Sequence, residues 1–193
     1  MFLHMLSLHI LMLISNVIGS TPISEHTKDI HKKLFDDYYR TVLPSPIFGA
    51  RFSVHVSFSL FSLDEVNEKD QSVVTTGRLF LRWSDRAFVW NKGRYGNVSS
   101  IFVDQKDIWL PDITVGNSIT SNLRLGFDEL PCRVKSDGSV HWTPTVRLQT
   151  SCTIDVTYFP FDTQECDIVF ETLITSEDEV TILLDLVKIH ALR

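Results

Sequence analysis

The chain has 193 residues, with 24 acidic and 18 basic side chains and a formal net charge of −6. This length fits a single domain that is large enough to bury a hydrophobic core. An acidic chain without any run of Lys or Arg is poorly suited to the phosphates of nucleic acid, so we exclude a nucleic-acid partner.

Residues 1–20 are almost uncharged and rich in Leu, Ile and Met. This composition predicts a secretory signal peptide with Gly19 and Ser20 as small residues for cleavage, although the usual basic residues are missing. A membrane anchor is the alternative, but His4, His9, Ser15 and Asn16 interrupt the apolar run. We therefore expect the secretory pathway, with the chain at the extracellular face of the cell membrane or secreted.

Residues 27–42 form the one good helical stretch. Apolar residues recur at every fourth position from Ile30 to Val42, and Lys and Asp occupy the other face. Thr27 is a candidate N-cap, and Pro44 follows the expected end. The pattern predicts an amphipathic helix that lies across the end of a sheet.

After this helix the apolar period changes to two. Alternating side chains predict strands at 52–60 and 73–83, with a charged turn at 64–70. Residues 132–134 and 140–142 flank a Ser-Asp-Gly-Ser turn and predict a hairpin. Many short strands with a single helix indicate an all-β fold, an immunoglobulin-like β-sandwich.

The segment between Cys152 and Cys166 carries the most specific pattern. Alternation at 153–158 predicts a short strand, which Pro160 ends because it has no N–H to donate. The tip of the segment is aromatic and acidic, which suits contact with a neighbour better than a core. A disulfide closing this loop would restrict the unfolded chain by roughly 3 kcal/mol.

The pattern C-x6-F-P-F-D-x-Q-x-C resembles the signature loop of the Cys-loop receptors, the pentameric neurotransmitter-gated ion channels. Their soluble relatives, the acetylcholine-binding proteins, share the same extracellular domain. An ordinary secreted disulfide hairpin is the alternative interpretation. The residues that carry the resemblance are Phe159, Pro160, Phe161, Asp162 and Gln164.

Further segments resemble the same family in chain order: Trp83-Ser84-Asp85-Arg86, Trp109-Leu110-Pro111-Asp112 and the hairpin from Arg133. The resemblance implies a disulfide between Cys152 and Cys166 and a twisted β-sandwich with one N-terminal helix. It also implies assembly with other subunits into a homo- or hetero-pentamer. A small-molecule ligand, such as a neurotransmitter, would bind between subunits, and the loop tip at 159–162 would press on the membrane domain.

Cholinergic members of this family hold a quaternary ammonium group in a box of aromatic rings at a subunit boundary. At three positions of that box this chain carries Gly116, Leu173 and Arg78. The third ligand loop, with its adjacent cysteines, does not appear. We therefore expect a ligand-binding domain at 21–193 that is incomplete at its C-terminal end, lacks the membrane helices and does not form a typical acetylcholine box.

The resemblance places Arg78, Arg133, His141 and Thr143 on the complementary face of the ligand site. The two arginines could hold a carboxylate or another anionic ligand by charge-assisted hydrogen bonds. The alternative is that both are exposed strand residues without a ligand.

Three cysteines are compatible with an oxidising compartment, with one pair and one thiol left over. Cys132 is the odd thiol, and we expect it to be buried and free rather than bridged to another chain. Asn97 begins an Asn-Val-Ser glycosylation sequon, which we expect on an exposed loop.

No catalytic motif, metal-ligand spacing or nucleotide-binding loop occurs in the sequence, so we predict neither an enzyme nor a cofactor. The acidic residues at 177–179 could bind Ca²⁺, but an acidic triplet in a loop is more often simply solvated. Two functions stay open. The chain is either part of an ion-channel subunit, attached to a membrane only through a missing C-terminal region, or a soluble binding protein or truncated modulatory subunit.

Overall fold

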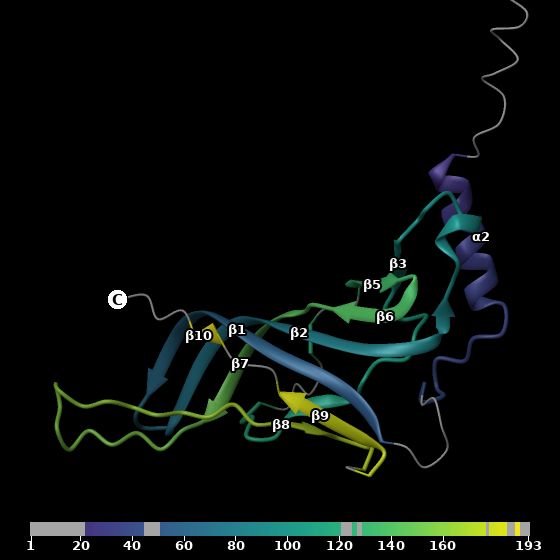
Figure 1. Ribbon diagram of the computed structural model, residues 1–193. Coiled ribbons are helices and arrows are strands. Elements are labelled where there is room, and N and C mark those ends of the chain that lie inside the picture. The colour runs from purple at the N-terminus through teal and green to yellow at the C-terminus, as the bar shows by residue number, and fades with distance from the viewer. Residues whose placement is uncertain are drawn as a thin grey trace, which may run out of the picture.

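The computed structural model describes residues 22–44, 51–120, 125–126, 129–176, 178–184 and 188–189. The predicted signal peptide lies outside these residues, as does the first residue of the acidic triplet. The elements are α2 (Ile23–Phe35), β1 (Phe52–Asn67), β2 (Ser72–Val89), the short 3₁₀ helix η1 (Lys92–Arg94), β3 (Ser100–Asp104), β4 (Ile113–Val115), β5 (Pro131–Lys135), β6 (Asp137–Trp142), β7 (Thr145–Ser151), β8 (Phe170–Thr172), β9 (Val180–Leu184) and β10 (Lys188–Ile189) (Figure 1).

Helix α2 is confirmed as an element, but both predicted ends are wrong. It begins after Pro22, whose φ of −57° is fixed by its ring, and Thr27 is no cap, since its hydroxyl donates to the carbonyl of Ile23. It ends at Phe35 because Tyr38 must leave the helix to donate its hydroxyl to the Asp85 carboxylate at 2.9 Å. This bond fastens the segment after the helix to β2.

Strands β1 and β2 are longer than predicted and form one antiparallel ribbon. The alternation is confirmed: Val54 and Val56 are buried, while the serines between apolar positions of β1 face outward. Pairing continues to Asn67 opposite Ser72, through two register shifts, so the predicted charged turn shrinks to the residues between those two. The ribbon therefore spans most of the molecule.

The large sheet has the order β10-β1-β2-β6-β5-β3, with β7 added to β2 and β9 to β1. Strand β2 pairs with β7 along its first half and with β6 along its second half. The predicted hairpin is confirmed in β5 and β6, with Gly138 at a φ of +85° that disfavours any side chain. A second sheet, β4–β8, lies over the first. The all-β sandwich with one N-terminal helix is thus confirmed.

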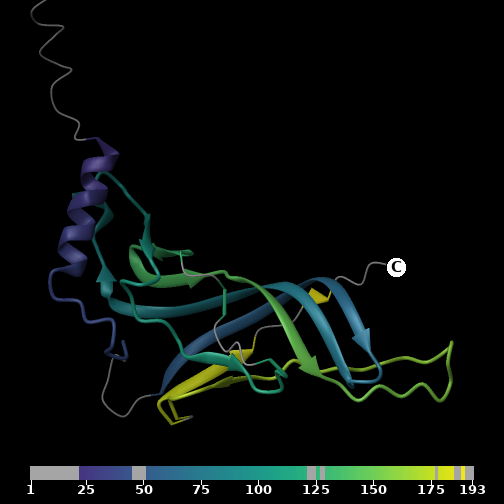
Figure 2. The same cartoon turned by 180° about the vertical axis from the view of Figure 1, so that it is seen from behind.

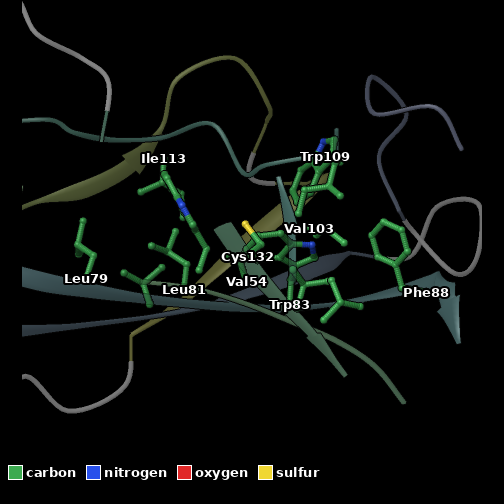
Figure 3. Close-up of a cluster of buried hydrophobic side chains, with 14 of the residues drawn as sticks. Val54, Leu79, Leu81, Trp83, Phe88, Val103, Trp109, Ile113 and Cys132 are labelled. Atoms are coloured by element: carbon green, nitrogen blue, oxygen red, sulfur yellow. The ribbon is translucent and has the colours of Figure 1, made fainter. Parts of the chain in front are cut away.

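The core fills the space between the sheets. Trp109 is buried and packs edge-on against Trp83 with ring centroids 5.9 Å apart. Figure 3 shows both indoles in one cluster with Leu81 and the sulfur of Cys132. Cys132 is a free, fully buried thiol, and burial, followed by the charge of Asp104, raises its pKa to about 12. The expectation of a buried free cysteine is confirmed.

The two ends of the molecule differ. Helix α2 stands at one end of the sheets, and the loop between β7 and β8 projects at the other, beside the turn between β1 and β2 (Figures 1 and 2). Both views agree on this separation. The aromatic loop tip is therefore far from the helix.

Candidate functional site

The loop at 152–166 is closed by a disulfide between Cys152 and Cys166, whose Cα atoms lie 5.3 Å apart. This confirms the pairing that the resemblance implied. Its tip is solvent-exposed: Tyr158 and Phe159 are each 76% exposed, and Phe161 is 90% exposed. A cluster of large exposed apolar side chains is typical of a surface that contacts another molecule.

Side chains, rather than a strand, shape this loop, so the strand predicted at 153–158 is wrong. The Gln164 amide accepts from the Asp155 backbone N–H at 3.0 Å and donates to the Asp155 carbonyl at 2.7 Å. It also donates to the Asp162 carboxylate at 2.6 Å. These bonds occupy backbone groups that a strand would need for pairing. Gln164 therefore joins the two sides of the loop.

Gln71 anchors the loop to the turn between β1 and β2. Its carbonyl accepts from the Cys152 N–H at 2.8 Å, and its side-chain oxygen accepts from the Ile154 N–H at 2.7 Å. The backbone of Gln71 has a φ of +48°, which is uncommon for a residue with a side chain. Sequence reasoning missed this residue, because nothing in its local pattern distinguishes it from other polar residues of a charged turn.

Gly116 and Leu173 lie at opposite ends of the β4–β8 pair, which we call the principal side. Leu173 donates its N–H to the carbonyl of Asp112, whereas Gly116 donates to the carbonyl of Val169. Leu173 is 55% exposed and brings no aromatic ring to this side.

The Asp112 carboxylate holds the residues after Leu173. It accepts from the N–H groups of Ile174 and Thr175, and from the Thr175 hydroxyl at 2.7 Å. Burial alone raises the pKa of Asp112, but the hydrogen bonds from Thr175 and Ile174 outweigh burial and lower it. Asp112 thus positions the loop that carries Leu173.

Glu171 occupies the space beside Gly116. A Cβ atom added to Gly116 would lie 2.6 Å from a carboxylate oxygen of Glu171, which is too close for a real contact. The principal side therefore presents an exposed carboxylate, that of Glu171, beside Gly116.

The four residues that the resemblance assigns to the complementary face lie on the outward face of the large sheet or at its edge. Arg133 on β5 is directly opposite His141 on β6, and Thr143 follows β6. Arg78 is opposite Ser59 and Thr145 instead. The structure therefore brings Arg133 and His141 together and sets Arg78 apart from them.

Arg82 is the arginine that sequence reasoning missed. It lies opposite His141 on β6, so Arg82, His141 and Arg133 form one row across three strands. Arg78 is four residues away along β2, roughly 13 Å at about 3.3 Å per residue. Only the strand register reveals this row.

Burial and the positive charges nearby shift the pKa of His141. Burial lowers the pKa of His141, and the positive charges of Lys135 and Arg82 lower it further. The guanidinium groups of Arg78 and Arg133 rest on the rings of Phe61 and Phe102, at 5.3 and 4.8 Å. The only ion pairs formed by arginines within the described residues are Arg51–Asp178 and Arg147–Asp64.

Asn97 is exposed and lies just after η1, near the helix end of the molecule. Its φ is +62°, a conformation that Asn tolerates better than most residues. The side chain is therefore accessible on a turn, as a glycosylation sequon requires.

Within the part of the chain that the structure describes, no three His, Cys, Asp or Glu side chains are arranged to hold a metal ion. The same residues include no helix with the length and apolar character needed to cross a membrane.

Residues 27–190 match the family described as the neurotransmitter-gated ion-channel ligand binding domain. The chain belongs to this family. It is a family of ion channels, not of enzymes, and the fold, the disulfide loop and the sequence agree on it. The relatives that the chain matches are acetylcholine receptor subunits.

The acetylcholine receptor subunit beta of Rattus norvegicus is 34% identical over 183 residues, which cover 92% of this chain and 36% of the relative. The neuronal subunit beta-3 of the same species is 34% identical over 79% of this chain and 32% of the relative. The neuronal subunit alpha-5 of Bos taurus is 33% identical over 84% and 34%, respectively. The chain thus spans about a third of the length of these relatives.

Proposed function

We propose that this ligand-binding domain is the extracellular part of a subunit in a pentameric ligand-gated ion channel, where it transmits ligand binding to the gate. The observation that carries the proposal is the exposed ring cluster of Tyr158, Phe159 and Phe161 on a disulfide-closed loop. Gln164 joins the two sides of this loop, and Gln71 fastens its base to the turn between β1 and β2. A braced apolar tip is suited to pass a displacement to a neighbouring surface.

The ligand would bind between the principal side of one subunit and the complementary face of the next. Gly116 and Leu173 would lie on one side, and Arg78, Arg133, His141 and Thr143 on the other. Such a ligand gates the channel only if it binds the open and closed states with different affinity. Since the principal side has no ring at either position, we propose a ligand other than an acetylcholine-type cation.

A titration with choline tests the ligand part of the proposal. The cation–π attraction that several rings supply is worth about 2 kcal/mol or more at a desolvated site. We expect no saturable binding below about 1 mM, which corresponds to only about 4 kcal/mol of binding free energy. Tight micromolar binding would show that the loss of rings does not remove the cationic site.

The exposed Asn97 and the disulfide support an extracellular placement reached through the secretory pathway. Secretion with a glycan on Asn97 would be detected as a mass that falls on glycosidase treatment. The variant Asn97→Gln should migrate at the deglycosylated mass without treatment.

The transcript beyond the codon of Arg193 tests the channel itself. Four apolar segments of about 20 residues each would support a membrane-anchored subunit. A stop codon directly after Arg193 would favour a soluble binding protein instead.

In the subunit encoded by that transcript, Phe159→Ser with Phe161→Ser should lower ligand-evoked current without lowering the amount at the cell surface. Val42→Ser is the control, because Val42 is 61% exposed and lies just beyond helix α2, away from the loop. Equal currents in the loop variant and wild type would contradict a role in transmission.

A further inference from the structure

A concave site lies on the outward face of the large sheet, between the start of β1 and the end of β2. Its volume is about 450 Å³, within the range of about 300–1,000 Å³ that small-molecule pockets have. The polar side chains around it include Arg51, Ser53, His55, Arg82, Arg86 and Ser139. No Asp or Glu is among the described residues that line it.

Strand register builds this pocket. His55 on β1 is directly opposite Arg82 on β2, and Ser84 on β2 is opposite Ser139 on β6. Alternation along β2 sends Leu81, Trp83 and Asp85 inward, so Arg82, Ser84 and Arg86 face outward together. Three strands therefore contribute polar side chains to one concave surface.

Among the described residues, little negative charge compensates the arginines of the pocket. Arg82 and Arg86 form no ion pair with any carboxylate in the described ranges. Arg51 pairs with Asp178 at 3.4 Å, but both side chains are exposed to solvent, where such a pair contributes little. Asp85, the nearest carboxylate in sequence, faces the other side of the strand and accepts a hydrogen bond from Tyr38.

We propose that this pocket binds a small organic or inorganic oxyanion, held through a carboxylate or phosphate group. The arginine forks match the two oxygens of such a group, and serine hydroxyls can donate to it as well. Arg82 is the central residue, because it is the pocket arginine that lies in register with both His55 and His141. The site needs no second subunit, so it does not rest on the proposed channel function.

Calorimetric titration of the full chain at low ionic strength tests the proposal, with succinate and inorganic phosphate as separate probes. We expect saturable one-to-one binding of at least one probe, and the probe that binds more tightly identifies the preferred group. Arg82→Gln and Arg86→Gln should each raise Kd tenfold or more. Arg94→Gln is the matched control, since Arg94 is also exposed and lies on η1, outside the pocket lining; its Kd should stay within twofold of wild type.

Ser139→Leu separates a pocket from general attraction by surface charge. This change narrows the pocket but leaves every charge in place, so it should weaken binding at least tenfold. Near-UV circular dichroism verifies that each variant keeps its packed tryptophans. The proposal is overturned if neither probe binds the wild type, if Arg94→Gln weakens binding as much as Arg82→Gln, or if Ser139→Leu binds normally. Should Arg82→Gln fail to fold, Arg86→Gln and Ser139→Leu still decide the outcome.

Discussion

The disulfide loop and the ligand-facing surfaces have diverged to different degrees from the cholinergic pattern. The loop keeps Phe159, Pro160, Phe161, Asp162 and Gln164, and two of these residues, Gln164 and Asp162, are joined by a hydrogen bond within it. At the positions that the family resemblance assigns to ligand binding, Gly116, Leu173 and Arg78 stand in place of aromatic rings. Under the proposed function, the scaffold for transmitting a signal and the chemistry for recognising a ligand are therefore separable within one fold.

If the loop is stabilised mainly by its covalent closure, removing the disulfide should have the largest effect of the changes at the loop and the principal side. For Cys152→Ser with Cys166→Ser we expect the free energy of unfolding to fall by about 3 kcal/mol, since a loop of this length regains that much chain entropy. Urea unfolding followed by tryptophan fluorescence measures it. Ser151→Ala is the control, because Ser151 is exposed and lies beside the loop. Cys132→Ser would not be a suitable control, because that thiol is buried in the core. An unchanged midpoint in the double variant would show that packing alone holds the loop.

Asp112→Asn should have the next largest effect, and it acts on the principal side. We expect a loss of about 2 kcal/mol, because hydrogen bonds to a charged acceptor are worth about 1.5–3 kcal/mol. The folded-state pKa of Asp112 is lowered, so its contribution is complete above the unfolded pKa of about 3.9 and is lost as the pH falls through the folded value.

Unfolding curves at pH 7 and at about pH 3 distinguish this effect from general destabilisation. The stability gap between wild type and Asp112→Asn should narrow at the lower pH. Asp107→Asn, an exposed aspartate nearby in sequence, should show no gap at either pH. A gap for Asp112→Asn that does not depend on pH would argue against the charged acceptor.

Gln71→Ala should have a smaller effect, confined to the base of the loop. It removes the acceptor of the Ile154 N–H, and a typical hydrogen bond contributes about 1 kcal/mol net. Amide hydrogen exchange should therefore accelerate at Ile154 while amides of β3 keep their protection. Exchange at Ile154 that stays at the wild-type rate would show that Gln71 does not anchor the loop.

Phe161→Ser should leave stability within about 0.5 kcal/mol of wild type, since Phe161 is 90% exposed. Phe88→Ala is the contrasting variant: Phe88 is fully buried, and its truncation should cost about 3–5 kcal/mol. Thermal unfolding of the two variants side by side provides the measurement. A large loss for Phe161→Ser would mean that the tip packs within the domain, rather than being available to a partner.

The sequence by itself determined the family, the all-β class, the existence of one helix and the pairing of Cys152 with Cys166. These depend on local patterns: periods of two and four, and a loop whose side chains occur at fixed spacing. The predicted C-terminal end of the helix was wrong because the Tyr38–Asp85 bond joins residues that are distant in the chain. The strand at 153–158 was wrong because alternation shows which side chains suit a strand, but not whether a partner strand exists.

Only the tertiary structure decided which charged residues meet. Arg82 joins His141 and Arg133 through the register of three strands, whereas Arg78, the position that the family pattern marks, lies apart from that row. Likewise, Gln71 became the anchor of the loop because a turn between two other strands folds beside it. The physical reason is that hydrogen-bond register between strands is set by the packing of the whole sheet, which no short stretch of sequence contains.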